Sequence, residues 1–98
     1  MPRYSTTTRF TKDWAALDPA DRARFKAAVR ERFVPDLETG HGFRAGLRVK
    51  RIESTDFVWE MTFAPDGRAT WQYADDSTEG DPHVLWRRIG THDVLRAP

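Results

Sequence analysis

The amino-acid sequence predicts an α+β fold: an N-terminal strand and a helical hairpin packed on one face of a mostly antiparallel sheet of four or five strands. Two observations support this fold class. Apolar residues recur at helical spacing between positions 18 and 34, and they alternate with polar residues at every second position after position 46. The 98 residues match the size of one domain, so we expect residues 1–98 to form a single domain.

The first half of the chain is expected to form one strand and two helices. Residues 3–10 alternate as a strand does and are rich in threonine. A short helix capped by Thr11 should follow. Asp18 and Pro19 are an N-cap and a first helical residue, so they predict the start of a second helix. We expect Pro35 to end that helix, because proline has no N–H to donate.

The second half of the chain is expected to form strands joined by short turns. Glycines at positions 40 and 42 make residues 36–45 a predicted loop. The pattern then predicts four strands: "GLRVKRI", "DFVWEMTF", "ATWQYA" and "HVLWRRI". The "APDGR" segment between the second and third has the composition of a hairpin turn. In "DFVWEMTF", alternation places these residues on one apolar face: Phe57, Trp59, Met61 and Phe63.

Composition limits the classes of function. The chain has no cysteine, which excludes disulfides and thiolate metal sites, and its three histidines lack the spacing of metal ligands. We therefore expect no metal and no cofactor. His83 follows Pro82 at a strand start and is expected to be a turn residue. No apolar run approaches the ~20 residues of a membrane span, and no signal peptide is recognisable, so we expect a cytoplasmic protein without a membrane partner.

The net charge of +1 conceals a segregated distribution. Basic residues gather at positions 44–51 and 87–96, whereas acidic residues gather in "ADDSTEGD". Such segregation permits a local positive patch on a nearly neutral protein, which favours an anionic ligand. The last strand runs through two arginines into "GTHD", where His92 could transfer protons near neutral pH.

The element order and the C-terminal segment together resemble the RelE/ParE toxin superfamily of bacterial type II toxin–antitoxin systems. The resemblance is carried by the helical hairpin after the first strand, by "LRVKRIESTDFVWEMTFAPDGRATWQY", and by the terminal "WRRIGTHDVL". The Gly-Thr-His segment is most similar to the YafQ branch of mRNA interferases. The resemblance implies a toxin that cleaves mRNA on the ribosome without a metal and is held inactive by a cognate antitoxin.

The resemblance also implies roles for individual residues. His92 matches a tail histidine used in catalysis, Lys50 lies on a strand that carries basic catalytic residues, and Arg68 lies where an arginine binds the scissile phosphate. With Arg88 as a further phosphate ligand, these four residues form the expected catalytic set on the open sheet face. We expect further RNA contacts from Arg44, Arg48, Arg51, Arg87 and Tyr73. The sequence departs from the YafQ branch at Val49 and Arg51, which replace an acid and a histidine.

Three alternatives stay open at this point. Tyr73 either packs in the core or stacks on a base. A relative without catalytic activity could use the same basic face to bind RNA, a ribosome or a protein. A further hypothesis is that the protein inhibits gyrase, although that activity requires no proton-transfer residue such as His92. The sequence determines neither the oligomeric state, the antitoxin, the codon preference, nor which group is the general base and which the general acid.

Overall fold

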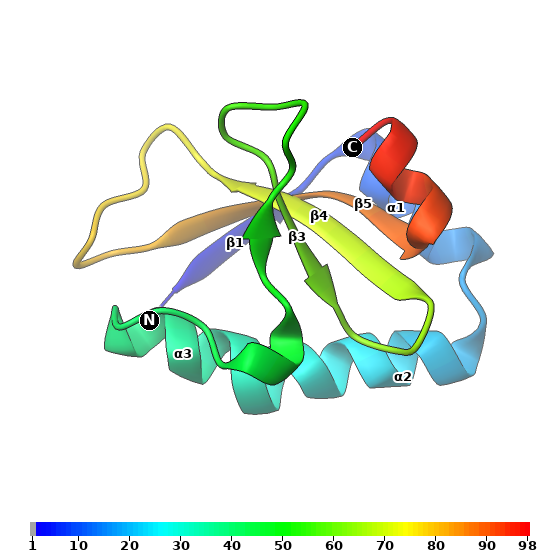
Figure 1. Ribbon diagram of the computed structural model, residues 1–98, viewed down its shortest axis with the longest axis horizontal. Helices are drawn as coiled ribbons and strands as arrows, with labels where there is room; N and C mark the ends of the chain where they lie inside the picture. The colour runs from blue at the N-terminus through cyan, green and yellow to red at the C-terminus, as the bar shows by residue number, and fades with distance from the viewer. Residues whose placement is uncertain (1) are drawn as a thin grey trace.

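A computed structural model describes residues 2–98 and shows an α+β protein built around one mixed sheet (Figure 1). The elements follow in this order: β1 (Arg3–Thr6), α1 (Thr8–Ala16), α2 (Pro19–Ala28), the π turn η1 (Val29–Phe33), α3 (Val34–Thr39), the 3-10 turn η2 (Ala45–Leu47), β2 (Lys50–Arg51), β3 (Trp59–Thr62), β4 (Gly67–Tyr73), β5 (His83–Thr91) and the 3-10 turn η3 (His92–Arg96). The five strands lie in the order β1-β5-β4-β3-β2. Among the strands of residues 2–98, only β1 and β5 pair in parallel, so the predicted fold class is confirmed.

The first helix begins earlier than the sequence predicted. β1 ends at Thr6, and α1 begins at Thr8, so the predicted strand over residues 3–10 is too long. The N-cap is Thr7 and not Thr11: the Thr7 hydroxyl accepts a hydrogen bond from the Phe10 N–H at 3.0 Å. The same hydroxyl donates to the Arg87 carbonyl on β5 at 2.7 Å. A contact between residues 80 positions apart therefore decides where the helix starts.

The second helix does not end at Pro35, as the sequence predicted. It begins at Asp18 and Pro19 as expected, but it passes through η1 and continues as α3 to Thr39. In the π turn, the Val34 N–H bonds to the Val29 carbonyl, which breaks the regular α-helical ladder. Pro35 then lies in the first turn of α3, where a backbone N–H has no partner within the helix. The missing N–H of proline is therefore tolerated there. Gly40, with a φ of 70°, ends the helix in the left-handed conformation.

The segment before β3 is less regular than predicted. Leu47 is buried in η2, and Arg48 has a φ of 49°, so only Lys50 and Arg51 remain of the strand expected from "GLRVKRI". Phe57 was predicted on the apolar strand face, but it lies outside β3 and is 58% exposed. The Ile52 N–H donates a hydrogen bond to the Val58 carbonyl and so closes the loop between these residues. The alternation of the strand therefore begins only after Val58. The "APDGR" hairpin between β3 and β4 is confirmed.

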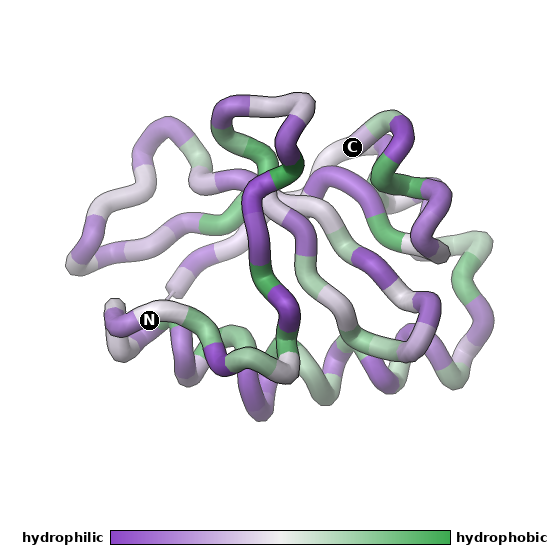
Figure 2. Tube along the Cα trace, in the orientation of Figure 1, coloured by the Kyte–Doolittle hydropathy of each residue, from purple (hydrophilic) through white to green (hydrophobic). Residues whose placement is uncertain are grey.

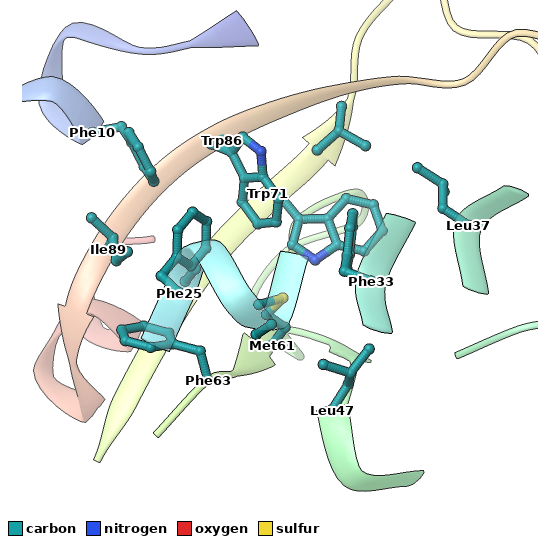
Figure 3. Packing of buried hydrophobic residues seen from close by; sticks show 13 residues of the cluster. Phe10, Phe25, Phe33, Leu37, Leu47, Met61, Phe63, Trp71, Trp86 and Ile89 are labelled. Atoms are coloured by element: carbon teal, nitrogen blue, oxygen red, sulfur yellow. The ribbon is translucent and has the colours of Figure 1, made fainter. Parts of the chain in front are cut away.

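The hydrophobic core lies between the sheet and the helical segment formed by α2, η1 and α3. Hydrophilic and hydrophobic residues alternate along this segment, as in an amphipathic helix (Figure 2). Its apolar side chains meet Trp71 of β4 and Trp86 of β5 (Figure 3). Phe25 contacts Trp86 edge to face with ring centroids 5.1 Å apart, and Phe33 contacts Trp71 in the same way at 5.2 Å. Phe25 and Trp71 are buried in this core, and the predicted apolar position of Met61 is confirmed.

The C-terminal segment is anchored because β5 lies between β1 and β4. Gly90 does not turn the chain but continues β5, and a side chain there would meet Val94 at 3.0 Å. The turn follows at Thr91, whose hydroxyl accepts a hydrogen bond from the Asp93 N–H. Among residues 2–98, no helix is both long and apolar enough to span a membrane.

Candidate functional site

The side of the sheet that faces away from α2 carries a row of polar residues, one from each of four strands. Pairing places Lys50 opposite Glu60, Glu60 opposite Thr70, and Thr70 opposite Arg88. Residues that pair across strands share a face, and at ~4.8 Å per strand the row spans roughly 14 Å. Arg68 lies in the neighbouring row, opposite Thr62 and Gly90. We call the side of the sheet with these residues the polar face.

A bulge in β5 gives the polar face a second arginine. Thr70 pairs with Arg88 and Trp71 pairs with Trp86, so Arg87 is the extra residue between them. Because a bulge shifts the alternation, Trp86 and Ile89 can both reach the core while the arginines stay on the other side. The Arg87 guanidinium donates to the amide oxygen of Gln72 on β4.

The C-terminal residues pack on part of the polar face. The Pro98 carbonyl accepts hydrogen bonds from the Thr70 hydroxyl at 3.2 Å and from Arg87 Nε at 3.1 Å. The Ala97 carbonyl accepts one from Arg88 Nη1 at 3.2 Å. This cover explains why Thr70 is fully buried although it belongs to a polar face. The carbonyl oxygens of Pro98 and Ala97 therefore occupy guanidinium donors of Arg87 and Arg88, the kind of donor that binds phosphate oxygens.

Arg88 is held by a carboxylate from α1. Its Nε and Nη2 atoms donate to Asp13 at 2.8 and 3.1 Å, and Asp13 also accepts the Ile89 N–H at 3.2 Å. Each side chain of the pair is 17% exposed. The hydrogen bond to Asp13 raises the pKa of Arg88 above its ordinary value. Asp13 therefore fixes the position of the Arg88 side chain. The remaining donor, Arg88 Nη1, binds the Ala97 carbonyl instead of Asp13.

Glu60 is a carboxylate buried on the polar face. Its residue exposure is 7%, and Lys50 Nζ lies 3.9 Å from Glu60 Oε1 across the β2–β3 pair. The Lys50 side chain itself is 71% exposed, so it can reach a ligand above the sheet. Sequence reasoning missed Glu60, although its place between two apolar residues of a strand identifies it as a polar-face residue.

His92 and Arg68 both lie near the hairpin turn between β3 and β4. Gly67 pairs with Thr91, which brings the residue after β5 beside the start of β4. The His92 N–H donates to Asp66 at 3.4 Å, and the Arg68 guanidinium donates to the Gly67 carbonyl at 3.0 Å. His92 is exposed, and its imidazole forms no hydrogen bond with another group of residues 2–98.

The other basic residues expected to bind RNA are dispersed. Arg44 binds Asp36 on α3 through two N–H···O bonds of 2.9 Å, and the hydrogen bonds from Arg44 lower the pKa of Asp36 to about 2. Arg48 follows η2, outside the strands. Arg51 pairs with Trp59, so it lies on the helix side of the sheet.

Tyr73 belongs to the helix side of the sheet and not to the polar face. It contacts Trp71 edge to face with ring centroids 5.2 Å apart, and the residue is 44% exposed. Partial burial raises the pKa of the Tyr73 hydroxyl. Of the open alternatives for Tyr73, its position favours packing at the margin of the core.

A groove beside the end of β5 is a poor site for an anion. It has a volume of about 840 Å³ and lies between the two N-terminal helices, the β3–β4 turn and the end of β5. Its charged lining is Asp13, Asp21, Asp66, Asp93, Arg24 and Arg88. Four carboxylates against two guanidinium groups repel phosphate, so the polar face is the better candidate. No group of three metal-binding side chains occurs within residues 2–98.

Comparisons with known proteins identify the fold. No family model and no curated protein sequence matches the chain. Among solved structures, it is similar to YafQ from E. coli strain BL21(DE3), with 15% identity and a TM-score of 0.65 over 97% of this chain and 98% of that chain. A chain of the E. coli DinJ–YafQ complex has 13% identity and a TM-score of 0.61, over 97% and 98% of the two chains. A chain of the RelB–RelE antitoxin–toxin complex from Methanococcus jannaschii has 14% identity and a TM-score of 0.62, over 94% of each. The protein therefore has the fold of YafQ and RelE, as the sequence resemblance predicted.

Proposed function

From this fold, we propose that the protein is the toxin of a type II toxin–antitoxin system and that it cleaves mRNA on the ribosome. Support comes from the likeness to YafQ and to the RelB–RelE antitoxin–toxin complex and from the cations of the polar face. The observation that carries the proposal is the position of His92. It is exposed and lies beside the start of β4, where Arg68 stands.

Cleavage of RNA by this route needs three kinds of group. A base removes the proton of the ribose 2′-hydroxyl, which attacks the adjacent phosphorus atom. An acid protonates the departing 5′-oxygen, and cations stabilise the charge that grows on the phosphorane. We assign proton transfer to His92, because an imidazole ring can both accept and donate a proton. Glu60 is a candidate for the second proton-transfer group, because it is the buried carboxylate of this face.

Lys50, Arg68, Arg87 and Arg88 are the proposed cations. A preorganised donor of this kind contributes on the order of 3 kcal/mol to the transition state. Arg87 and Arg88 already bind the carbonyl oxygens of Pro98 and Ala97, which stand in for phosphate oxygens. An RNA phosphate would take over these donors when the C-terminal residues move aside.

The test is induced expression followed by primer extension on cellular mRNA. We expect the parent chain to arrest growth and to create new cleavage ends, and His92→Gln to lose both effects. His41→Gln is the matched control, because His41 is an exposed histidine in the loop after α3. A His92→Gln protein that cleaves mRNA as well as the parent would contradict the assignment.

A second function is a module that binds RNA or the ribosome without cleaving. The exposed Lys50 side chain favours binding, whereas Gln72, Asp13 and the C-terminal carbonyls engage the Arg87 and Arg88 donors that a cleavage step would need. Co-sedimentation with ribosomes in the absence of new mRNA ends would support this function. The same result with cleavage would support the toxin.

A cognate antitoxin would cover an apolar groove of about 510 Å³ formed by β1, α1, α2, η1 and β5. Phe10, Trp14 and Val29 line it, while Lys26 and Arg30 supply positive charge at the same groove. These features fit an acidic amphipathic segment. If a small acidic protein is encoded next to this gene, the paired Lys26→Glu and Arg30→Glu substitutions should weaken its complex with this chain. Arg96→Glu, on η3, is the control, and an unchanged affinity of the paired variant would exclude the groove.

A further inference from the structure

Three side chains form a continuous hydrogen-bond chain at the other end of the sheet from His92. Ser5 Oγ lies 2.8 Å from His83 Nε2, and His83 Nδ1 lies 2.5 Å from Asp76 Oδ1. Ser5 belongs to β1, His83 begins β5, and Asp76 lies in the β4–β5 loop. Since β5 has 9 residues, this cluster lies roughly 26 Å from the His92 end of the strand and roughly 13 Å from Arg87. The cluster shares no residue with the proposed RNA site.

The fold brings these residues together through the parallel pairing of β1 and β5. Arg3 pairs with His83 and Ser5 pairs with Leu85, so Ser5 and His83 share a face and stand one step apart. The β4–β5 loop folds back over the same end. The Ser77 hydroxyl accepts the His83 N–H at 2.8 Å, and the Ala74 N–H donates to the His83 carbonyl at 2.8 Å. These bonds hold Asp76 beside the imidazole ring.

The direction of each hydrogen bond follows from the charge of Asp76. Hydrogen bonds from Arg3, and then from His83, hold the pKa of Asp76 below its ordinary value, so this carboxylate is ionised at neutral pH and can only accept. His83 Nδ1 must therefore carry the proton that is shared with Asp76. In neutral histidine, Nε2 is then an acceptor, and the Ser5 hydroxyl is the donor. This is the protonation pattern that prepares a serine for attack.

Charged side chains surround His83. Arg3 binds Asp76 at 3.0 Å on one side and Asp81 at 3.0 Å on the other. Two carboxylates and one guanidinium leave a single negative charge beside the imidazole, which stabilises the positive charge that the ring gains when it accepts the Ser5 proton. The His83 side chain is only 16% exposed, whereas Ser5 is exposed. The base is therefore shielded while the nucleophile stays accessible.

From this geometry we propose that Ser5 is an activated nucleophile that accepts the acyl group of small carboxylic esters, with His83 as general base and Asp76 as positioning residue. Ser5 Oγ forms a bond to the carbonyl carbon, and His83 Nε2 takes the hydroxyl proton. The carbon–oxygen bond of the ester then breaks, and His83 returns the proton to the departing alcohol. Water releases the acyl group from Ser5 as a carboxylic acid by the same steps. The reaction needs no other co-reactant.

The test uses the full chain and p-nitrophenyl acetate at neutral pH. We expect a burst that approaches one nitrophenolate per chain, with one acetyl group on the peptide that contains Ser5. Ser5→Ala should abolish the burst, and His83→Gln should slow it on the order of 10²-fold. The matched controls are Ser54→Ala and His41→Gln, which change an exposed serine and an exposed histidine elsewhere.

Two further measurements decide the roles. Nitrogen NMR of the His83 ring should show the proton on Nδ1 in the parent and on Nε2 in Asp76→Asn, with slower acylation in that variant. The acetyl group is mapped in the parent chain, so this measurement does not depend on whether any variant folds. Acetylation of His83 alone, or a burst that survives Ser5→Ala, would overturn the proposal. Neither RNA nor ribosomes enter this test, so its failure is distinct from failure of the mRNA-cleavage proposal.

Discussion

Asp13 of α1 and Arg88 of β5 form a two-pronged ion pair whose N···O distances are 2.8 and 3.1 Å. The residues are 75 positions apart in the chain, and Asp13 also accepts the Ile89 N–H. The pair therefore joins the first helix to β5, an interior strand of the sheet, and it positions the arginine that we assign to phosphate binding. A residue proposed for function is thus also a structural link.

Arg88→Ala should lower the free energy of unfolding by about 2 kcal/mol, because it leaves a mostly buried carboxylate without its charged partner. For a chain of this size, that corresponds to a fall in Tm of roughly 10 °C. Asp13→Ala should have a similar effect, and the double variant should lose less than the sum of the two. Arg96→Ala is the control, since Arg96 and Asp93 are both well exposed. Additive losses in thermal unfolding would show that the two groups do not interact.

Thr7→Ala should destabilise the protein by about 1 kcal/mol, because Thr7 is the N-cap of α1 and also binds the Arg87 carbonyl. Thr11→Ala should have a clearly smaller effect, since the Thr11 hydroxyl forms only a 3.3 Å bond to the Thr7 carbonyl. Urea unfolding of both variants provides the comparison. Equal losses would restore Thr11 as the cap that the sequence predicted.

Gly40→Ala should cost about 1 kcal/mol of stability, because Gly40 ends α3 with a φ of 70°. Gly46→Ala, in η2, should be neutral or slightly stabilising: its φ is not positive and a side chain there meets no atom within 4 Å. Equilibrium unfolding distinguishes the two positions. A neutral Gly40→Ala would show that the helix does not end there in solution.

Phe25→Ala should cost about 4 kcal/mol, because the Phe25 ring contacts Trp86 and Phe63 in the core. Phe57→Ala, by contrast, should change stability by less than about 0.5 kcal/mol, since Phe57 is 58% exposed. Thermal unfolding of the two variants tests the corrected position of Phe57. A large loss at Phe57 would place it back on the apolar strand face.

Acid should weaken the contact between α3 and the following loop. The pKa of Asp36 is lowered to about 2 in the folded chain by hydrogen bonds from Arg44, against 3.8 for the ordinary group. A lowered pKa means that the stabilisation is complete above the ordinary value and is lost as the pH falls from about 4 towards 2. Unfolding of Asp36→Asn should lack this part of the pH dependence. If both proteins lose stability equally over that range, the pair with Arg44 does not form.

Local sequence signals were reliable where the physical cause is itself local. Asp18 and Pro19 start α2 as predicted, because a cap acts on its own turn. The hairpin at Pro65–Gly67 and the alternation of Trp59 and Met61 are likewise properties of a few adjacent residues. Pro35 misled the prediction, because the π turn before it removes the clash that ends an ordinary helix.

The candidate site was predictable only in part. The sequence indicated Lys50, Arg68, Arg88 and His92, and their roles stay predictions. It could not show that Arg88 binds Asp13, that residues 97 and 98 lie on Thr70, or that Glu60 joins the same row. Each of these relationships depends on strand order and register, which residues far apart in the chain determine together.

The sequence by itself determined the α+β fold class, the amphipathic α2, the hairpin turn and the set of basic residues, because patterning and turn chemistry act over a few positions. Only the tertiary structure decided where α1 begins, that β5 lies inside the sheet, and that Ser5, His83 and Asp76 meet. His83, expected to be a turn residue, gains its partners only when β1 pairs in parallel with β5. Parallel pairing joins segments 80 residues apart, and no local pattern encodes its register.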